Sequence, residues 1–251
     1  MQIAMGGQLI GAAMVPDIMR FTVGAHPGRV QQIPQTLRTG RARLPRPAEP
    51  TATTRTAVLS VTIDPTMPPN FISSGMMTID NLRFRDPDFD RPIQGSVEQW
   101  DIVNADYLLE VHDFHIHLVQ FRVIGRQDYD IAHYLAANPP GLIGNRWTPS
   151  ADPFTTGPLR PPAPYESAWK DTVRCPPTQI TRILVRWPDQ HELGFDPDAT
   201  YPTANCGDER GYVFHCHLLD HEDHEMMLRM RIVATNTTDD TDQGTAQHTG
   251  H

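Results

Sequence analysis

The stretch YVFHCHLLDHEDHEMMLRM, residues 212–230, places one cysteine between two histidines and follows it with further histidines and a pair of methionines. The side chains of interest are His215, Cys216, His217, His221, Met226 and Met227. Thiolate, imidazole and thioether groups are the ligands that suit copper. A second cluster, HDFHIH at residues 112–117, lies about a hundred residues upstream. We interpret the rest of the chain as a scaffold that brings the two clusters together.

The spacing of the histidines divides them into two sites. Side chains on a β-strand alternate between its two faces. In FHCHL, His215 and His217 therefore share one face, and Cys216 occupies the other. In HIH, His115 and His117 share a face, whereas His112 lies an odd number of residues from His115. We predict one site from the four paired histidines, and a second site from Cys216, His112, His221 and a methionine.

The second set of ligands favours copper over zinc. Two histidines, one cysteine and a weak thioether are typical of a blue-copper electron-transfer site. Zinc also accepts cysteine and histidine ligands, but it requires neither a methionine at a fixed distance nor a second histidine face. The His-Cys-His order also has a direct use, because an electron accepted at a copper bound to Cys216 can pass through one residue of backbone to either flanking histidine.

Composition excludes some classes of protein. The chain has 251 residues, enough for one large domain or two small ones. Its net charge of -9 argues against a nucleic-acid partner, which would require a basic face. No apolar run approaches the roughly 18–20 residues of a membrane span. The apolar N-terminus lacks a preceding basic segment, so we interpret it as part of a folded domain rather than a signal peptide. Cys175 and Cys206 either form a disulfide or are two free thiols.

Seven short strand-like segments predict an all-β sandwich or barrel. They lie at residues 56–63, 71–84 with a turn at 73–75, 96–104, 114–125, 179–187, 212–217 and 227–233. Residues 126–170 form a long proline-rich loop with a single helical turn at IAHYLA, residues 131–136. Loops of that length are usually functional.

The strand signals suggest four regions. Residues 1–24 contain two short strands, at 1–5 and 17–23, which cannot form a core alone and therefore join the following domain or end an earlier one. Residues 25–55 are a linker rich in Pro, Arg and Thr. The copper-binding domain follows at 56–235, and a disordered tail is expected at 236–251.

The two clusters resemble the signatures of multicopper oxidases. HDFHIHLVQFRVIG is similar to their His-Pro-x-His-x-His motif, and YVFHCHLLDHEDHEMM to their His-Cys-His-x3-His-x4-Met motif. With AWKDTV at 168–173, the chain looks most like the spore-coat laccase, bilirubin oxidase and phenoxazinone synthase branch. The resemblance implies a cupredoxin-like Greek-key sandwich or barrel, C-terminal in such an oxidase, with residues 1–24 as a remnant of the middle domain. Asp113 replaces the usual proline and is expected to loosen the loop that carries His112.

The resemblance also implies a role for each ligand. A type 1 copper would be held by His112, Cys216 and His221, with Met226 rather than Met227 as axial ligand, because the family places this methionine ten residues after the cysteine. His115 would bind the type 2 copper, and the type 3 pair would take His117, His215 and His217. Glu222 matches an acidic residue that delivers protons during dioxygen reduction. The alternative for Glu222 is a solvated position in the charged HEDHE loop.

A trinuclear centre in this family takes eight histidines, four of them from two His-x-His motifs of an N-terminal cupredoxin domain. This chain offers four, so the resemblance implies that an N-terminal domain or a second chain completes the site. The whole enzyme would be laccase-like, would oxidise phenolic or aromatic amine donors and would reduce dioxygen to water. The alternative is a mononuclear blue-copper electron carrier or an inactive copper-binding fragment. The resemblance implies an exported, periplasmic or spore-surface location.

Overall fold

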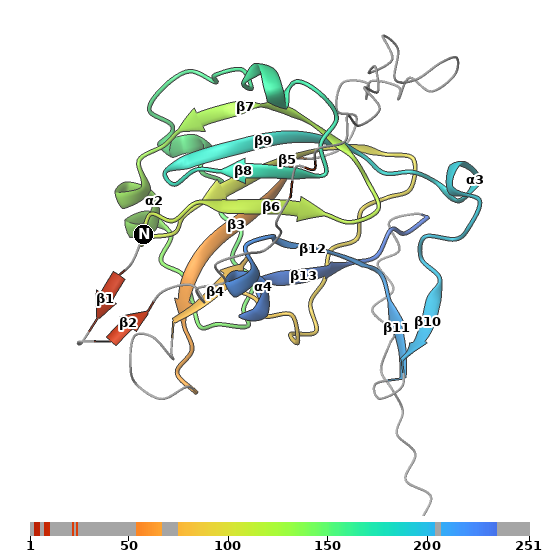
Figure 1. The fold of residues 1–251 in the computed structure, drawn as a ribbon, viewed down its shortest axis with the longest axis horizontal. Helices are drawn as coiled ribbons and strands as arrows, with labels where there is room; N and C mark the ends of the chain where they lie inside the picture. Colours follow the sequence, from red (N-terminus) through yellow and green to blue (C-terminus); the bar gives the residue numbers. More distant parts are fainter. Residues whose placement is uncertain are drawn as a thin grey trace, which may run out of the picture. The chain divides into compact units, whose positions relative to one another are not determined.

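The computed structural model describes residues 3–5, 8–10, 22, 24, 54–66, 75–203 and 207–234 (Figure 1). The chain forms two compact units, Met1–Pro45 and Arg46–His251. In the first unit, β1 (Ile3–Met5) pairs antiparallel with β2 (Gln8–Ile10). β1 lies inside the first predicted strand, whereas β2 occupies the segment predicted to connect the two strands. The second predicted strand, at 17–23, falls almost wholly outside the described residues.

The predicted linker and tail also fall largely outside the described residues. Residues 25–53 of the linker are not among them, and its last two residues begin β3. The predicted tail at 236–251 lies wholly outside. The division of the chain into these regions therefore stays a prediction.

The second unit contains two main sheets. The larger sheet has the order β4-β3-β5-β9-β7 and consists of β3 (Thr54–Ile63), β4 (Gly75–Ile79), β5 (Val97–Asn104), β7 (Phe121–Asp128) and β9 (Gln179–Arg186). The smaller sheet has the order β13-β12-β6-β8 and consists of β6 (His112–Ile116), β8 (Thr172–Cys175), β12 (Tyr212–Cys216) and β13 (Met227–Met230). A separate hairpin joins β10 (Thr200–Thr203) to β11 (Gly207–Arg210). The predicted all-β class is confirmed.

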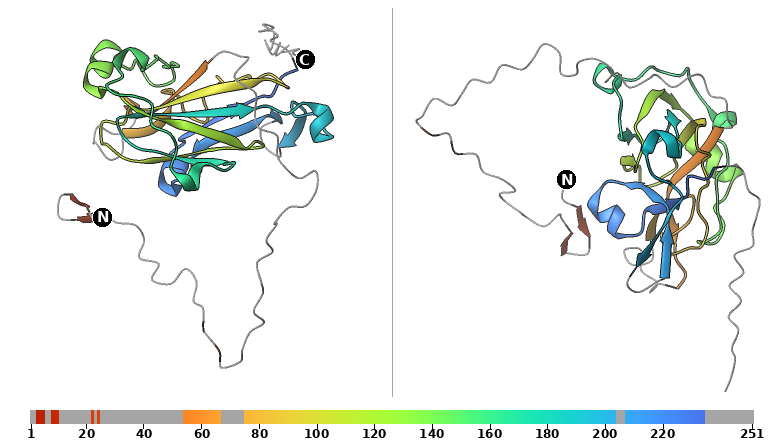
Figure 2. Two further views of the ribbon diagram at one scale, coloured as in Figure 1. Left: turned by 90° about the horizontal axis from the view of Figure 1, so that it is seen from above. Right: turned by 90° about the vertical axis from the view of Figure 1, so that its right-hand side faces the viewer.

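An aromatic cluster fills the space between the two sheets, which lie in two layers in Figure 2. Trp100, from the five-stranded sheet, is fully buried. Its ring lies 5.2 Å from that of Phe214 and 6.2 Å from that of Phe114, both on the four-stranded sheet. Aromatic pairs at such distances add specific contacts to the burial of apolar surface. This core supports β6 and β12, the two strands that carry most of the predicted ligands.

The predicted strand at 114–125 is wrong as a single element. β6 ends at Ile116 and β7 begins at Phe121, and the two strands belong to different sheets. Leu118, between them, has a φ of 70°, which a bulky residue rarely adopts. The chain changes sheets inside an apolar run that contains no Gly or Pro, so the sequence offered no turn signal. Strand β8 was not predicted either.

The described helices are short. The predicted turn at 131–136 is confirmed as α2 (Ile131–Ala137), and α3 (Gln190–Leu193) and α4 (Leu219–Asp223) were not predicted. Two 3-10 turns, Asp152–Phe154 and Pro164–Glu166, lie in the long segment after β7. Figure 2 shows α4 on the outer side of the four-stranded sheet. None of the helices in the described part of the chain has the length and apolar character of a membrane span.

Ion pairs attach the long segment after β7 to the sandwich. The guanidinium of Arg146 lies 2.8 Å from Asp80 and 3.3 Å from Asp90, both of which are buried. Arg126 in β7 holds Glu166 at 2.6 Å. The segment predicted as a long loop is therefore fixed by buried and half-buried charges rather than by a regular element.

Candidate metal centres

The pairing of β6 with β12 separates the predicted ligands into two faces. His215 lies opposite His115, and Cys216 lies opposite Phe114. Residues directly opposite each other in a sheet share a face. The two histidines therefore project from one face, and Cys216 projects from the other, toward the core. His112 begins β6 as a paired strand residue rather than lying in a loop, and the loosening expected from Asp113 stays a prediction.

The first cluster, which we call the thiolate site, consists of His112, Cys216 and His221. All three are buried, and they come from β6, β12 and α4. The two Nδ1 atoms lie 3.2 Å apart, and Cys216 Sγ lies 3.6 Å from that of His112 and 3.5 Å from that of His221. An ion bound at about 2.0 Å from nitrogen and about 2.3 Å from sulfur, as zinc is, would need separations of roughly 3.3–3.7 Å. The ligand atoms thus fit a single metal ion.

Two carboxylates hold the outer nitrogens of these histidines. His112 Nε2 lies 3.3 Å from Asp106 Oδ2, and His221 Nε2 lies 3.2 Å from Glu110 Oε2. Such contacts fix the tautomer and orientation of a metal-binding imidazole. Asp106 is fully buried, whereas 41% of the Glu110 side chain is exposed. Sequence reasoning missed both residues, because their only sequence signal is acidity in the loop before His112.

The histidines turn Cys216 into an acidic thiol. Burial alone would raise its pKa, but hydrogen bonds to His112 and His221 outweigh burial and lower the pKa to about 6. Cys175 is also buried but has no such partners, and burial raises its pKa to about 12. The thiolate is the form that binds metals. Cys175 is a free thiol, and its candidate partner Cys206 lies outside the described residues.

The register of β13 distinguishes the two methionines. Met227 lies opposite His215 and therefore faces the same side as that histidine. Met226, one residue earlier, is fully buried in the core cluster that contains Cys216. Its N–H donates to the carbonyl of His221, and its carbonyl accepts the N–H of Cys216, both at 3.1 Å. Met226 is thus fixed between two members of the thiolate site.

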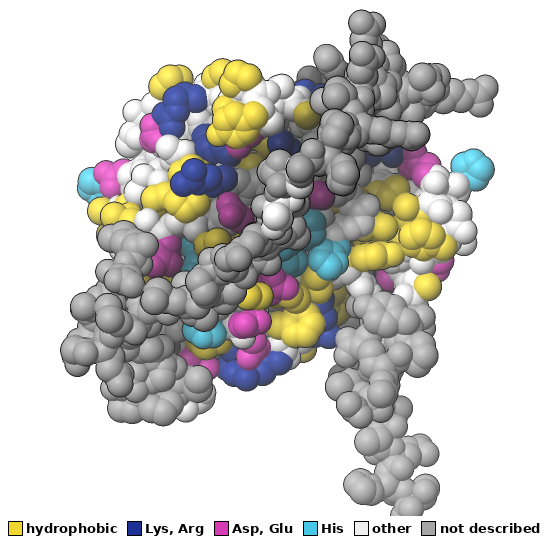
Figure 3. Space-filling model, viewed as in Figure 1, with side chains coloured by type: hydrophobic (Ala, Val, Ile, Leu, Met, Phe, Trp, Pro, Cys, Tyr) yellow, Lys and Arg dark blue, Asp and Glu magenta, His cyan; other side chains and the backbone are white. Residues whose placement is uncertain are grey.

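The second cluster, which we call the four-histidine face, consists of His115, His117, His215 and His217. One nitrogen from each of the first three lies within 4.8 Å of the others. The ring of His217 lies 5.3 Å from that of His215 and 5.4 Å from that of His115, but His217 is exposed and lies outside the tighter group. Figure 3 shows histidine side chains gathered at the surface over β6 and β12. The four-histidine face is therefore partly exposed to solvent.

Two members of this face, His117 and His215, are suited to bind metals as neutral imidazoles. Burial, followed by the neighbouring His115 and His215, lowers the pKa of His117, and burial also lowers the pKa of His215. Neutral imidazole is the form that coordinates a metal. His115 Nδ1 lies 2.8 Å from the carbonyl of Asp171, which leaves its other nitrogen for a ligand.

One turn of α4 contacts both clusters. His221 belongs to the thiolate site, and the next residue, Glu222, lies 3.4 Å from Nδ1 of His215. The same Nδ1 lies 3.1 Å from the carbonyl of Cys216. Glu222 retains 30% of its side-chain exposure. It therefore connects solvent with the four-histidine face.

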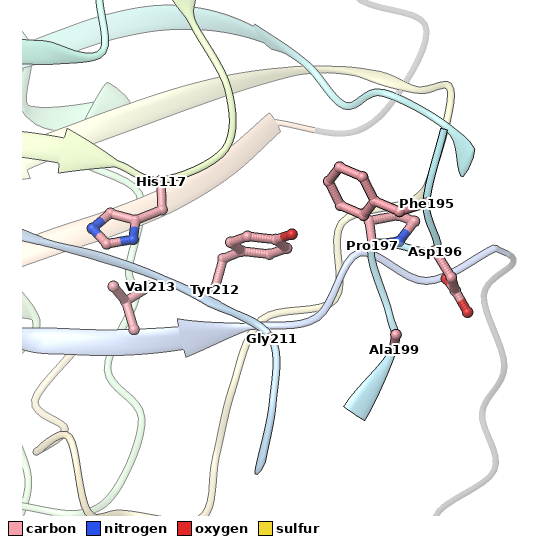
Figure 4. Close-up of a pocket in the computed structure, with 8 residues that line it drawn as sticks. All are labelled: His117, Phe195, Asp196, Pro197, Ala199, Gly211, Tyr212 and Val213. Atoms are coloured by element: carbon pink, nitrogen blue, oxygen red, sulfur yellow. The ribbon is translucent and has the colours of Figure 1, made fainter. Parts of the chain in front are cut away.

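A cavity of about 440 Å³ borders the four-histidine face (Figure 4). Its lining consists of His117, Phe195, Asp196, Pro197, Ala199, Gly211, Tyr212 and Val213. In Figure 4 the ring of Tyr212 lies between His117 and Phe195. Sequence reasoning did not anticipate this cavity, because residues 195–199 meet His117 only through the tertiary fold.

Comparison with known sequences finds similarity to multicopper oxidases, including a laccase. A family model described as multicopper oxidase matches residues 53–236. A laccase of Bacillus subtilis is 34% identical over 158 residues, which cover 62% of this chain and 24% of that protein. A multicopper oxidase of Oryza sativa, LPR1 homolog 3, is 31% identical over 167 residues, covering 66% of this chain and 29% of that protein. The chain spans about a quarter of the length of these relatives.

Two solved structures that match this chain share less sequence identity with it than these relatives do. The crystal structure of a laccase from Pediococcus acidilactici is 20% identical, with a TM-score of 0.46, and the match covers 82% of this chain and 32% of that chain. A laccase-like multicopper oxidase from an Ochrobactrum species is 24% identical, with a TM-score of 0.44, over 84% of this chain and 36% of that chain.

Proposed function

The chain belongs to the multicopper oxidase family, and on this premise we propose that it is the C-terminal, copper-binding part of a laccase-like oxidase. In this proposal, His112, Cys216 and His221 hold a type 1 copper, with Met226 as the axial ligand. The observation that carries the proposal is the convergence of two Nδ1 atoms and one thiolate at 3.2–3.6 Å inside the core. The burial of Met226 on the Cys216 side of the sheet supports its assignment.

A copper ion bound at the thiolate site would supply one-electron transfer. The protein's contribution is to keep Cys216 as a thiolate, through His112 and His221, and to exclude water from all three side chains. The backbone of Cys216 continues directly into His215 and His217. The thiolate site and the four-histidine face are thus joined through a single residue.

On the other face, we assign His115 to a type 2 copper and His117, His215 and His217 to a type 3 pair. Three of these nitrogens already lie within 4.8 Å of one another. The four histidines of this face are half of the eight that the family resemblance implies. The proposed enzyme therefore needs an N-terminal cupredoxin domain or a second chain, and with it would oxidise phenolic or aromatic amine donors and reduce dioxygen to water.

Glu222 is proposed to move protons to the four-histidine face. Its contact with His215 and its partial exposure support this role, because a proton carrier must meet both solvent and the site. The 3.4 Å contact with buried His215 favours this role over a purely solvated position.

One observation supports the alternative of a mononuclear electron carrier. The proposed type 1 ligands all lie within this chain, so the thiolate site needs no partner. The four-histidine face would then be an incomplete remnant. The two functions differ in whether the chain, with or without a partner, consumes oxygen.

Copper reconstitution tests the proposal. The full metal-free chain is loaded with copper, and the intense thiolate-to-copper absorption is recorded beside oxygen uptake with a phenolic donor. We expect colour in the wild type and in Cys175→Ser, and none in Cys216→Ser. Colour without oxygen uptake in the isolated chain fits both the partner requirement and the carrier. Uptake that appears only when an N-terminal cupredoxin domain is added supports the oxidase.

Two results would contradict parts of the proposal. Oxygen uptake by the chain alone would show that half of a trinuclear centre is sufficient. A colourless wild type, with a reactive Cys216 thiol, would remove the type 1 assignment.

A further inference from the structure

The turn between α4 and β13, at residues 224–226, contains a backbone conformation that its sequence does not favour. Glu225 has a φ of 68°, which lies in the left-handed region. Glycine and asparagine adopt this region readily, whereas glutamate does so at a cost in free energy. The next residue is Met226, the proposed axial ligand. A strained residue beside a functional side chain needs a contact that stabilises it there.

Backbone hydrogen bonds close this turn but do not explain the glutamate. The N–H of Glu225 donates to the carbonyl of Glu222 at 3.0 Å, and the Glu225 carbonyl accepts the N–H of Met227 at 2.7 Å. The N–H of Met226 donates to the carbonyl of His221 at 3.1 Å. These bonds use only backbone atoms, so glycine or asparagine at position 225 would form them equally well. What distinguishes glutamate at this position is its carboxylate.

The Glu225 carboxylate is held by Arg85, from the connection between β4 and β5. Nη1 of Arg85 lies 3.0 Å from Oε1, and the backbone nitrogen of Arg85 lies 3.5 Å from Oε2. Only 28% of the Glu225 side chain is exposed, compared with 58% of the Arg85 side chain. One arginine therefore contacts both oxygens of the carboxylate, through its side chain and its backbone. We call this pair of contacts the Arg85 clamp.

The loop that carries this arginine is itself fixed to the sandwich. The guanidinium of Arg83 lies 2.9 Å from Asp86 and 3.2 Å from Asp64, whose side chain is fully buried. The carbonyl of Asp86 accepts an N–H of the Arg229 side chain, on β13, at 3.0 Å. Residues 83–86 therefore hold both β13 and the turn that precedes it.

We propose that Arg85 is a positioning residue: through Glu225 it holds the left-handed turn, and through the turn it sets where the Met226 thioether lies relative to Cys216. Met226 and Cys216 belong to the same buried cluster, so a shift of the turn is transmitted to the thiolate site. The inference rests on the proposed function for its meaning at copper, because the axial ligand tunes the potential of a blue-copper site. The clamp itself can be measured without metal.

Four variants separate the ion pair from the backbone conformation. Arg85→Gln and Glu225→Gln both remove the ion pair and leave at position 225 a residue that does not favour the turn. Arg85→Lys keeps the charge, and Glu225→Asn removes the charge but supplies a residue that adopts a positive φ readily. Arg186→Gln is the matched control, because it breaks a pair with Glu192 whose side chains are 33% and 38% exposed.

The first measurement uses the full metal-free chain with carbon-13 methionine methyl groups, and the Met226 resonance is assigned by its loss in Met226→Leu. An exposed ion pair changes an equilibrium by up to about fivefold. We expect Arg85→Gln and Glu225→Gln to shift the Met226 resonance in the same direction. Both should also speed hydrogen exchange of the Cys216 N–H, which donates to the Met226 carbonyl, by about twofold to fivefold. Arg85→Lys, Glu225→Asn and Arg186→Gln should stay close to the wild type.

Two results would overturn the proposal. A wild-type Met226 resonance and exchange rate in Arg85→Gln would show that the ion pair holds nothing. A Glu225→Asn variant that behaves like Glu225→Gln would show that the conformation of the turn is not what the clamp controls.

Copper loading separates this inference from the proposed function. Arg85→Gln should still develop the thiolate-to-copper colour, with an altered spectrum and a higher reduction potential than Arg85→Lys, because a displaced thioether donates less to oxidised copper. If the Met226 resonance moves in Arg85→Gln but the spectrum and potential do not, the clamp stands and Met226 is not the axial ligand. If the wild type develops no colour, the type 1 assignment is wrong, and the metal-free measurement still decides the clamp.

Discussion

Replacing His221 by asparagine should raise the pKa of the Cys216 thiol by about three pH units in the metal-free protein. Cys216 and Cys175 are both buried, yet their pKa values are about 6 and about 12. Among the groups that lower the pKa of Cys216, the two histidines within 3.6 Å come first, ahead of a backbone hydrogen bond at Leu218. If the two histidines contribute equally, removing one moves the pKa half of the way, to about 9, which corresponds to about 4 kcal/mol of lost thiolate stabilisation.

His221 is a better target than His112 for this experiment. His112 lies against Asp106, which is fully buried, so its loss would leave a buried carboxylate without its partner and destabilise the fold. His221 lies against Glu110, which is 41% exposed and can be solvated instead. Asparagine keeps a polar side chain near Cys216 but cannot carry a positive charge.

The assay follows the ultraviolet absorption of the thiolate during a pH titration of the metal-free chain. Subtracting the same titration of Cys216→Ser isolates the signal of Cys216. His224→Asn serves as the control, because His224 is exposed at the end of α4. A midpoint that stays near pH 6 in His221→Asn, or that moves equally in His224→Asn, would refute the role of the histidines in the acidity of this thiol.

Three further predictions concern stability. Gly211→Ala should lower the unfolding temperature and cost more than about 2 kcal/mol, because Gly211 has a φ of 96° and an added Cβ would overlap the carbonyl of Met230; an unchanged melting curve would contradict this. Phe214→Ala should cost about 3–5 kcal/mol in urea denaturation, because the ring is buried within the aromatic core; a loss below about 1 kcal/mol would show that the core closes around the gap. Arg146→Ala should cost about 3 kcal/mol, because it removes the cation that lies against both buried Asp80 and buried Asp90 and leaves their mutual repulsion unopposed. Burial and then Asp90 raise the pKa of Asp80 while Arg146 opposes them, so the wild type loses stability as pH rises through the range in which Asp80 ionises; the pKa of Asp80 should be higher still in the variant, which should therefore lose more stability between pH 7 and pH 9, and denaturation at these two pH values checks this.

The comparison between sequence and structure shows where strand periodicity is reliable. Alternation along HIH and FHCH correctly separated His115 and His215 from Cys216, because each strand has one face packed against the core. Periodicity failed between Ile116 and Phe121, where the chain crosses from one sheet to the other. Apolar residues are needed on both sides of that crossing, so the pattern does not change there.

Helix α4 shows a second limit. The segment LDHED has no apolar periodicity and is only five residues long, so the sequence pattern does not predict a helix there. Its position is set by tertiary contacts, because the Cys216 N–H donates to the Met226 carbonyl and so closes the loop. That closure brings His221 to Cys216 and Glu222 to His215. The proposed proton role of Glu222 first came from the family resemblance, and its contact with His215 came from the fold.

The sequence by itself determined the class of fold, the family, and the identity of the side chains that form the two clusters, because ligand chemistry and strand alternation are local properties of the chain. Only the tertiary structure decided how close the ligand atoms lie, how acidic Cys216 is, and that Asp106 and Glu110 contact the outer nitrogens of the histidines. Distances and pKa values depend on groups up to 109 residues apart in the chain. Folding brings those groups together and removes water from between them, and no local pattern records that juxtaposition.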